Sequence, residues 1–156
     1  MTLRTLQIVA VLVSPGVLAQ NRSASDLLHQ AALRGQTASI EMLLKLGADP
    51  NLRDKHGRTA LHDACLKDHV DAARMLLDGG ARVDVQDENG ATPLHDAALG
   101  GSGKAIELLL SRKADIDSKD SEGRTPLDYA LRMDRPEAAR ILRAARRTIH
   151  SAARAD

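Results

Sequence analysis

Two short stretches of the sequence place a histidine directly before an aspartate, TALHDACL at 59–66 and TPLHDAAL at 92–99. Histidine and aspartate side chains together could carry out acid–base chemistry or hold a metal ion. If these stretches are helical, adjacent side chains point about 100° apart around the helix axis. His95 and Asp96 therefore cannot face each other as a hydrogen-bonded dyad, and any chemistry would need partners from elsewhere in the chain.

A metal site is the next hypothesis, because His62, Cys65 and His69 form the pattern H-x-x-C-x-x-x-H. His29, His62 and His95 could also form a ladder of ligands along the chain. Helices that pack side by side lie roughly 8–10 Å apart, whereas zinc ligands lie about 2 Å from the ion. Histidines on successive helices are therefore too widely spaced to share one metal, and we expect neither a metal nor a cofactor.

The composition argues against other classes of function. The chain lacks the motifs of serine hydrolases, zinc peptidases, phosphate-binding loops and calcium-binding loops. Its formal net charge is only +1, so no overall positive charge would attract the phosphates of a nucleic acid. Aromatic residues are 1% of the chain, so there are too few rings for bases to stack on. We expect that the protein is not an enzyme and binds no nucleic acid. The single cysteine cannot form an internal disulfide.

Residues 1–19 have the pattern of a secretory signal peptide. A positive charge at Arg4 precedes an apolar run from Leu6 to Val13, and Ala19 supplies a small residue for cleavage. The run is shorter than the roughly 20 residues that span a bilayer. We expect cleavage after Ala19, a short linker over 20–25 and no membrane span in the mature chain. The alternative is that these residues form a buried N-terminal helix of the domain.

Several residue types recur at steps of 33 residues, which indicates an array of structural repeats. The recurring positions are Gly57, Gly90 and Gly123; Thr59, Thr92 and Thr125; Leu61, Leu94 and Leu127; Asp54, Asp87 and Asp120; and Leu43, Leu76, Leu109 and Leu142. A unit of this length cannot bury its own apolar stripe, so neighbouring units must stack to form the core. The scarcity of aromatic residues predicts an aliphatic core.

The unit from 89 to 121 predicts two short helices followed by an extended polar turn. Thr92 can cap the first helix, and Pro93 suits its first position because no hydrogen bond is lost there. Apolar residues then follow at a spacing of three to four. Gly101 should end this helix at a positive φ.

The stretches DKHGRTALHDACLKDHVDAARMLLDGGARVDVQ (54–86) and DENGATPLHDAALGGSGKAIELLLSRKADIDSK (87–119) resemble ankyrin repeats. They match D-x-x-G-x-T-P-L-H-x-A-A-x-x-G followed by V-x-x-L-L-x-x-G-A. The resemblance implies an all-α ankyrin-repeat solenoid of stacked helix-turn-helix units with β-turn fingers. The repeat domain should cover 26–147 as units 26–55, 56–88, 89–121 and 122–147, followed by a tail over 148–156.

The resemblance also implies structural roles for the residues that first suggested chemistry. In this family the motif histidine bonds to the turns and to the motif threonine, which implies that role for His29, His62 and His95. The repeated aspartates, Asp54, Asp87 and Asp120, should bond the backbone of adjoining turns. Cys65 stands where other units have alanine, so it should be an inert buried thiol.

The chain departs from the family pattern at a few positions. Asp68 and Asp134 replace glycines that end the first helix, and aspartate tolerates positive φ at some cost. Lys113 replaces another glycine, and Asp128 replaces the histidine. Six arginines follow in the last unit and the tail: Arg135, Arg140, Arg143, Arg146, Arg147 and Arg154. Because nothing stacks on a terminal repeat, they are most simply a solvated cap; the alternative is a site for an anionic partner.

Partner contacts in this family lie on the turn tips and the exposed side of the first helices, which form a concave face. The corresponding residues are Lys55, His56, Arg58, Asp63, Lys67, Glu88, Asn89, Asp96, Glu122, Arg124, Tyr129, Arg132 and Met133. Tyr129 and Arg132 should be anchors, because tyrosine and arginine are enriched at interface hot spots. The alternative is that Tyr129 only seals the last repeat.

These observations lead to a functional expectation that rests on the resemblance. We expect a monomer that binds another exported protein through the concave face, as an accessory or inhibitory partner. The alternative is a structural assembly factor of a larger envelope complex. The short leader and the lack of disulfides favour a bacterial periplasm, with secretion as the alternative.

Overall fold

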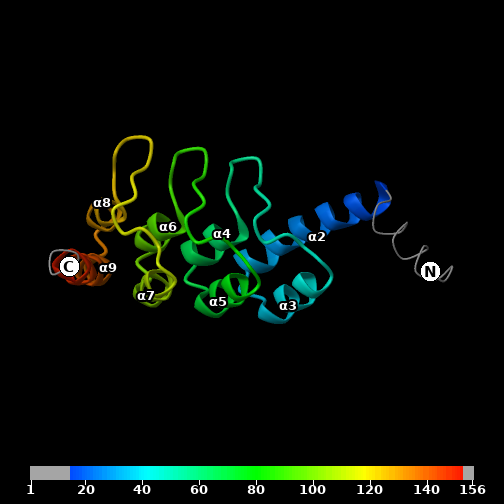
Figure 1. Ribbon diagram of the computed structural model, residues 1–156, viewed down its shortest axis with the longest axis horizontal. Coiled ribbons are helices and arrows are strands. Elements are labelled where there is room, and N and C mark those ends of the chain that lie inside the picture. Colours follow the sequence, from blue (N-terminus) through cyan, green and yellow to red (C-terminus); the bar gives the residue numbers. More distant parts are fainter. Residues whose placement is uncertain (1–14, 153–156) are drawn as a thin grey trace.

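The computed structural model describes residues 15–152, and within them the chain forms eight α-helices and no strands. Figure 1 shows the helices stacked in two rows, with three long fingers that project to one side. The helices are α2 (Pro15–Leu33), α3 (Thr37–Lys45), α4 (Ala60–Leu66), α5 (Val70–Asp78), α6 (Pro93–Gly100), α7 (Gly103–Ser111), α8 (Pro126–Arg132) and α9 (Pro136–Ala152). The predicted all-α repeat solenoid is confirmed.

The two rows of helices enclose one continuous aliphatic core. Helix α4 packs between α2 and α6, α6 packs against α8, and α3, α5, α7 and α9 form the outer row. Leu61 and Leu94 on the inner helices are fully buried, as are Leu76 and Leu109 on the outer helices. Each such leucine contributes about 1.5–3 kcal/mol by leaving water. Because these positions recur at the repeat period, stacking buries the same stripe in both interior units, while the equivalent Leu43 and Leu127 of the terminal units are only partly buried.

Local sequence signals set where the inner helices begin and end. Thr92 is extended at φ −96° and ψ 167°, and forms a capping box with His95 three residues later. Gly101 ends the same helix at φ 80°, as predicted. Asp68 and Asp134 take the equivalent position at φ 59° and 51°, a left-handed conformation that costs a residue with a side chain about 1–2 kcal/mol.

Both ends of the array differ from the predicted boundaries. Residues 20–25, expected as a linker, lie within α2, because no glycine or proline interrupts the chain between 17 and 33. The predicted cleavage point after Ala19 falls inside this helix, while residues 1–14 of the predicted leader lie outside the described residues. Helix α9 continues past 147 to Ala152. None of the helices that the structure describes has the length and apolarity that crossing a membrane requires.

Candidate functional site

The motif histidines of the two interior units are fully buried and link successive fingers. Nδ1 of His62 accepts a hydrogen bond from the backbone N–H of Thr59 at 3.1 Å, and Nε2 lies 3.2 Å from the carbonyl oxygen of Ala91. His95 makes the equivalent bonds, with Nε2 3.0 Å from the carbonyl oxygen of Arg124. Since Nδ1 accepts, the proton lies on Nε2 and each ring is neutral. Burial lowers the pKa of His62 to about 4 and also lowers the pKa of His95, so the predicted structural role of both is confirmed.

The two terminal units use this position differently. His29 has no motif threonine; its Nδ1 lies 3.0 Å from Oδ2 of Asp63, and its Nε2 lies 3.0 Å from the carbonyl oxygen of Leu52. Burial alone would lower the pKa of His29, but these two acceptors and the charge of Asp63 together raise it. The implied threonine bond is therefore wrong for His29. At the other end Asp128 accepts from the N–H and the hydroxyl of Thr125, both at 2.8 Å, and no further finger follows it among the described residues.

The repeated aspartates shape their own fingers. Oδ1 of Asp87 accepts hydrogen bonds from the backbone N–H groups of Asn89 at 2.8 Å and Ala91 at 3.0 Å. Asp54 and Asp120 bond in the same way to the residues two and four positions ahead. The expectation that they bond adjoining turns is therefore corrected: each carboxylate folds the turn to which it belongs.

Backbone groups and two turn side chains link one finger to the next. The N–H of Glu88 donates to the carbonyl oxygen of His56 at 3.0 Å, and the same link recurs one finger later. Nη2 of Arg53 donates to the carbonyl oxygen of Gln86 at 2.7 Å, and the Gln86 side chain reaches the next finger in turn. The finger tips are thereby held in a fixed register and present one continuous surface.

A cluster of charged side chains joins the second and third units on the concave side. Nη2 of Arg58 lies 3.1 Å from Oδ2 of Asp96 and 3.3 Å from Oδ1 of Asp63, and its Nη1 lies 3.8 Å from Oδ2 of Asp87. The side chains of Arg58 and Asp96 are only 18% and 4% exposed. One guanidinium is thus shared among three carboxylates, and little of it remains for an external partner.

The prediction that Asp96 faces a partner is wrong. Asp96 is buried, and Arg58 from the preceding finger pairs with it. Removal from water disfavours the charged carboxylate, and this burial raises the pKa of Asp96 to about 7 against the opposing effect of Arg58. The His–Asp dipeptide therefore contains two internal residues with separate roles.

Tyr129 combines both of the roles considered for it. Its hydroxyl donates to Oδ2 of Asp120 at 2.9 Å, which anchors the last finger. The ring packs edge-on against His95 with centroids 5.0 Å apart, and the guanidinium carbon of Arg124 lies 5.2 Å from the ring centroid. Burial and the bond to Asp120 raise the pKa of Tyr129 to about 12. The ring seals the last repeat and is still only partly buried.

Beside this ring lies a hollow of about 210 Å³ on the concave side. Its lining brings together the predicted residues Arg124, Tyr129, Arg132 and Met133 with Leu99. Met133 is 48% exposed, so its thioether is available to a partner. Leu99 was missed, although the 33-residue step from Leu33 and Leu66 places it at the same position of its unit.

The remaining predicted contacts do not line this hollow. Most are exposed, several of them on the fingers: Lys55, His56, Lys67, Glu88, Asn89 and Glu122. Arg58 and Asp63 are partly buried in the charged cluster. Only the last-unit residues of the predicted set are therefore gathered around a recess.

The proposed metal ligands are occupied by other contacts. Nε2 of His69 lies 3.2 Å from the carbonyl oxygen of Leu33, and both nitrogens of His62 are bonded as described above. Cys65 is fully buried, and burial raises the pKa of its thiol. Among the residues that the structure describes, no three histidine, cysteine or acidic side chains are grouped so that they could hold a metal ion.

The fold and the linked fingers define a stacked-helix repeat protein. A family model described as ankyrin repeats, in three copies, matches residues 4–87 and 79–152, and the chain belongs to this family. Ankyrin repeats are generally protein–protein interaction modules and are typically not enzymes. A comparison with curated proteins finds no match.

Proposed function

We propose that the protein is a monomer that binds another exported protein through its concave face, as an accessory or inhibitory partner. The hollow beside Tyr129 carries this proposal, because it combines a partly exposed aromatic ring, an exposed thioether and two arginines. Such side chains around a recess are typical of interface anchors. The bonds between fingers favour binding further, since a surface that is already ordered loses little entropy on association.

Export to a bacterial periplasm is part of the same proposal, and secretion is its alternative. The charged start, apolar run and small residue of the first nineteen positions support it. Cleavage after Ala19 would leave α2 starting at Gln20, upstream of the buried residues Ser25 and Leu28. The described contacts of the core would therefore survive removal of the leader. Cell fractionation tests this: a mature chain beginning at Gln20 should appear in the periplasmic fraction, whereas an intact chain in the cytoplasm would contradict it.

Capture from the periplasmic fraction tests the binding face. The tagged chain is expressed with its own leader, cross-linked and purified, and its partners are identified by mass spectrometry. The double variant Arg132→Glu, Met133→Lys changes two exposed residues of the hollow and should lose the captured protein. We expect at least about a tenfold lower yield, which corresponds to about 1.4 kcal/mol of binding free energy.

The matched control makes the same two changes on the outer helices. Arg74→Glu on α5 and Met42→Lys on α3 alter exposed residues of the outer row, and should leave capture unchanged. Equal loss in both variants, or equal capture by the hollow variant, would show that the binding face is elsewhere. Capture of one protein supports the accessory role, whereas several members of one complex would support an assembly factor instead.

A further inference from the structure

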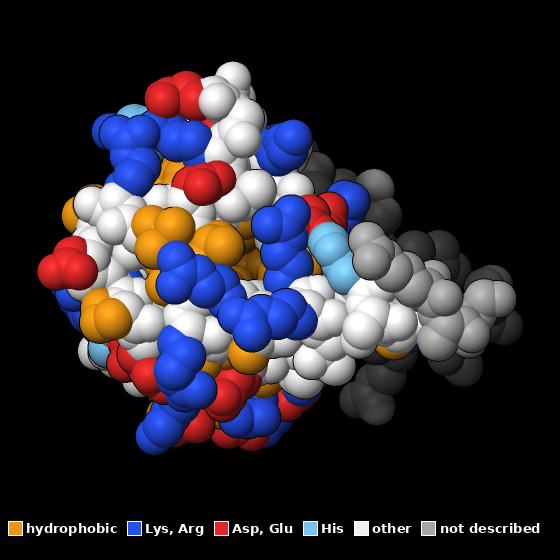
Figure 2. All heavy atoms as spheres, turned by 90° about the vertical axis from the view of Figure 1, so that its left-hand side faces the viewer, with side chains coloured by type: hydrophobic (Ala, Val, Ile, Leu, Met, Phe, Trp, Pro, Cys, Tyr) orange, Lys and Arg blue, Asp and Glu red, His pale blue; other side chains and the backbone are white. Residues whose placement is uncertain are grey.

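The C-terminal end of the stack presents a second surface, where no further repeat packs in the described chain. Figure 2 shows this end face, on which lysine and arginine side chains surround a patch of hydrophobic ones. Between Arg132 and Ala152 the chain has six arginines and two acidic residues, although the whole chain has a formal net charge of only +1. The positive charge is therefore concentrated at this end.

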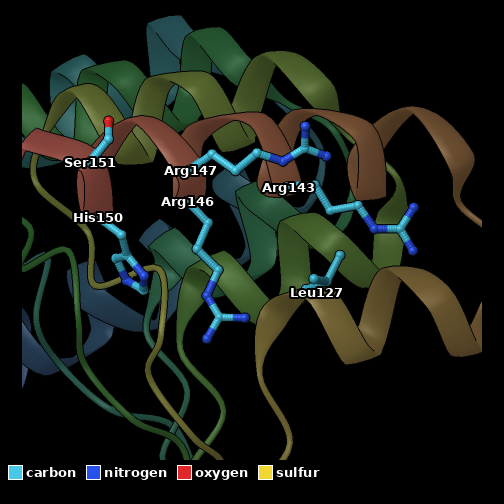
Figure 3. Close-up of a pocket in the computed structure, with 6 residues that line it drawn as sticks. All are labelled: Leu127, Arg143, Arg146, Arg147, His150 and Ser151. Carbon is cyan, nitrogen blue, oxygen red and sulfur yellow. The ribbon is translucent and has the colours of Figure 1, made fainter.

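A recess of about 580 Å³ lies between α8 and α9 on this surface. Leu127 of α8 lines one side, and the other lining residues come from the last turns of α9: Arg143, Arg146, Arg147, His150 and Ser151. In Figure 3, Arg146 and His150 extend from α9 toward the same side of the helix. A half-buried apolar side chain is thus surrounded by cationic and polar groups.

The cations of this recess divide into two kinds. Nε of Arg146 and Nε2 of His150 each lie 2.7 Å from an oxygen of Asp117, so one carboxylate ties the end of α9 to the segment before α8. Arg143 and Arg147 are exposed and have no ion pair or hydrogen bond with any residue that the structure describes. They differ in this from Arg140 on the same helix, which pairs with Glu137 at 2.6 Å.

We propose that this recess docks an acidic, amphipathic segment of a protein partner. Carboxylates of that segment would pair with Arg143 and Arg147, whose planar guanidinium groups suit two-point bonding to carboxylates. An apolar side chain of the segment would pack on Leu127. Leu131 (47% exposed) and Ile149 (45% exposed) lie on the same two helices, outside the lining of the recess, and offer further apolar surface at this end. Those apolar contacts favour a protein segment over nucleic acid, for which this chain offers only one aromatic ring.

This surface goes beyond the proposed function, since the concave face lies on another side of the last unit. Tyr129 of α8 lines the concave hollow, whereas Leu127 of the same helix lines the end recess. Loss of one site should therefore leave the other intact, and the two proposals can be tested separately.

Fluorescence anisotropy tests the proposal with the purified chain lacking residues 1–19. The probe is a labelled peptide of about 14 residues, a length at which isolated helices become marginally stable, with glutamate on one face and leucine on the other. Arg143→Gln with Arg147→Gln should raise its Kd about tenfold or more, because two charge pairs are lost. Arg82→Gln with Arg140→Gln removes the same charge from exposed sites outside the recess and should leave Kd within about twofold.

Three results would overturn the proposal. One is an equal loss of affinity in both double variants, which would indicate a diffuse effect of net charge. Another is equal binding of a peptide in which serine replaces every leucine, because Leu127 would then have no role. The third is that single-stranded DNA or anionic vesicles bind more tightly than the peptide and displace it. Urea unfolding of each variant verifies that these exposed substitutions leave the fold intact.

Discussion

Arginine side chains have opposite roles in the interior units and at the open end of the array. Arg58 is mostly buried and lies within 4 Å of three carboxylates that belong to two neighbouring units. Arg143 and Arg147 are exposed on α9 and have no carboxylate partner among the described residues. The difference arises because an interior arginine is covered by the next unit, which supplies counter-charges. Positive charge in a repeat sequence therefore indicates a binding surface only where no following unit neutralises it.

The motif histidine position shows the same contrast. His95 caps its own helix and also bonds to the next finger: its Nδ1 accepts from the N–H of Thr92, and its Nε2 donates to the carbonyl oxygen of Arg124. Asp128, at the same position of the last unit, makes only the capping bonds to Thr125. A carboxylate is sufficient for these capping bonds, and no further finger follows this unit in the described chain. The aspartate of the last described unit thus keeps the capping bonds of the motif histidine without a bond to another described finger.

The largest effect should come from Arg58→Gln. Removal of one member of a buried charge network leaves the others uncompensated, and we expect a loss of about 3 kcal/mol in the free energy of unfolding. Urea denaturation at pH 8, where Asp96 is charged, measures it. Arg143→Gln is the matched change at the open end and should stay within about 0.5 kcal/mol of the wild type. Similar values for both variants would remove the contrast between interior and end.

His95→Ala should be the next most disruptive change. It removes a fully buried ring and the bonds that join the third unit to the last finger, which should cost about 2–3 kcal/mol. Thermal unfolding followed by circular dichroism provides the measurement. His56→Ala, at an exposed finger position, is the control and should be nearly neutral. A nearly neutral His95→Ala would mean that the fingers do not depend on the histidine bridge.

The buried Asp96 makes stability depend on pH. Its pKa is about 7 in the folded chain and should be near the ordinary value of about 3.9 when unfolded. Between these values the folded state holds a proton that the unfolded state has lost, so stability falls as pH rises from about 4 to 7 and then levels off. Asp96→Asn removes this dependence, and its stability relative to the wild type should improve across that range by at least about 1.4 kcal/mol, the equivalent of one pKa unit.

Parallel urea titrations of the wild type and Asp96→Asn isolate this contribution. His29, whose pKa is raised, contributes stability that is present at low pH and is lost as pH rises through its folded value. Because both proteins retain His29, its effect cancels in the difference between them. A difference that does not change between pH 4 and pH 8 would contradict the burial of an ionisable Asp96.

The smallest effect should come from Asp128→Ala. It removes an N-cap partner but no link to a following finger, so we expect a loss of about 1 kcal/mol. Fluorescence of Tyr129, the only tyrosine, reports unfolding of the last unit, and circular dichroism reports the whole array. A loss as large as that for His95→Ala would show that Asp128 has a partner beyond its own helix cap.

Much of the fold could be predicted because its determinants are local and periodic. The 33-residue recurrence indicated the stacked units, and Thr92, Pro93 and Gly101 indicated where a helix begins and ends. The structural role of His95 followed from the family resemblance and is confirmed by its bonds. Residues 20–25 were expected as a linker but are helical, because they continue as part of α2.

The candidate site was less predictable, because exposure depends on contacts between units. Asp96 and Tyr129 occupy equivalent positions of consecutive units, yet one is buried under Arg58 and the other remains partly exposed beside a hollow. Leu99 joins that hollow only because its unit packs against the last one. No local pattern distinguishes these environments.

The order of residues along the chain determined the repeat period, the helix caps and the composition of the core, since each of these depends on neighbours within one unit. The tertiary structure decided which charged side chains pair with other residues of the chain and which face solvent. Arg58, which pairs with Asp63 of its own unit, meets Asp96, 38 positions further on, only after two units have stacked. Arg143 and Arg147 keep their charge exposed because no unit of the described chain packs over them.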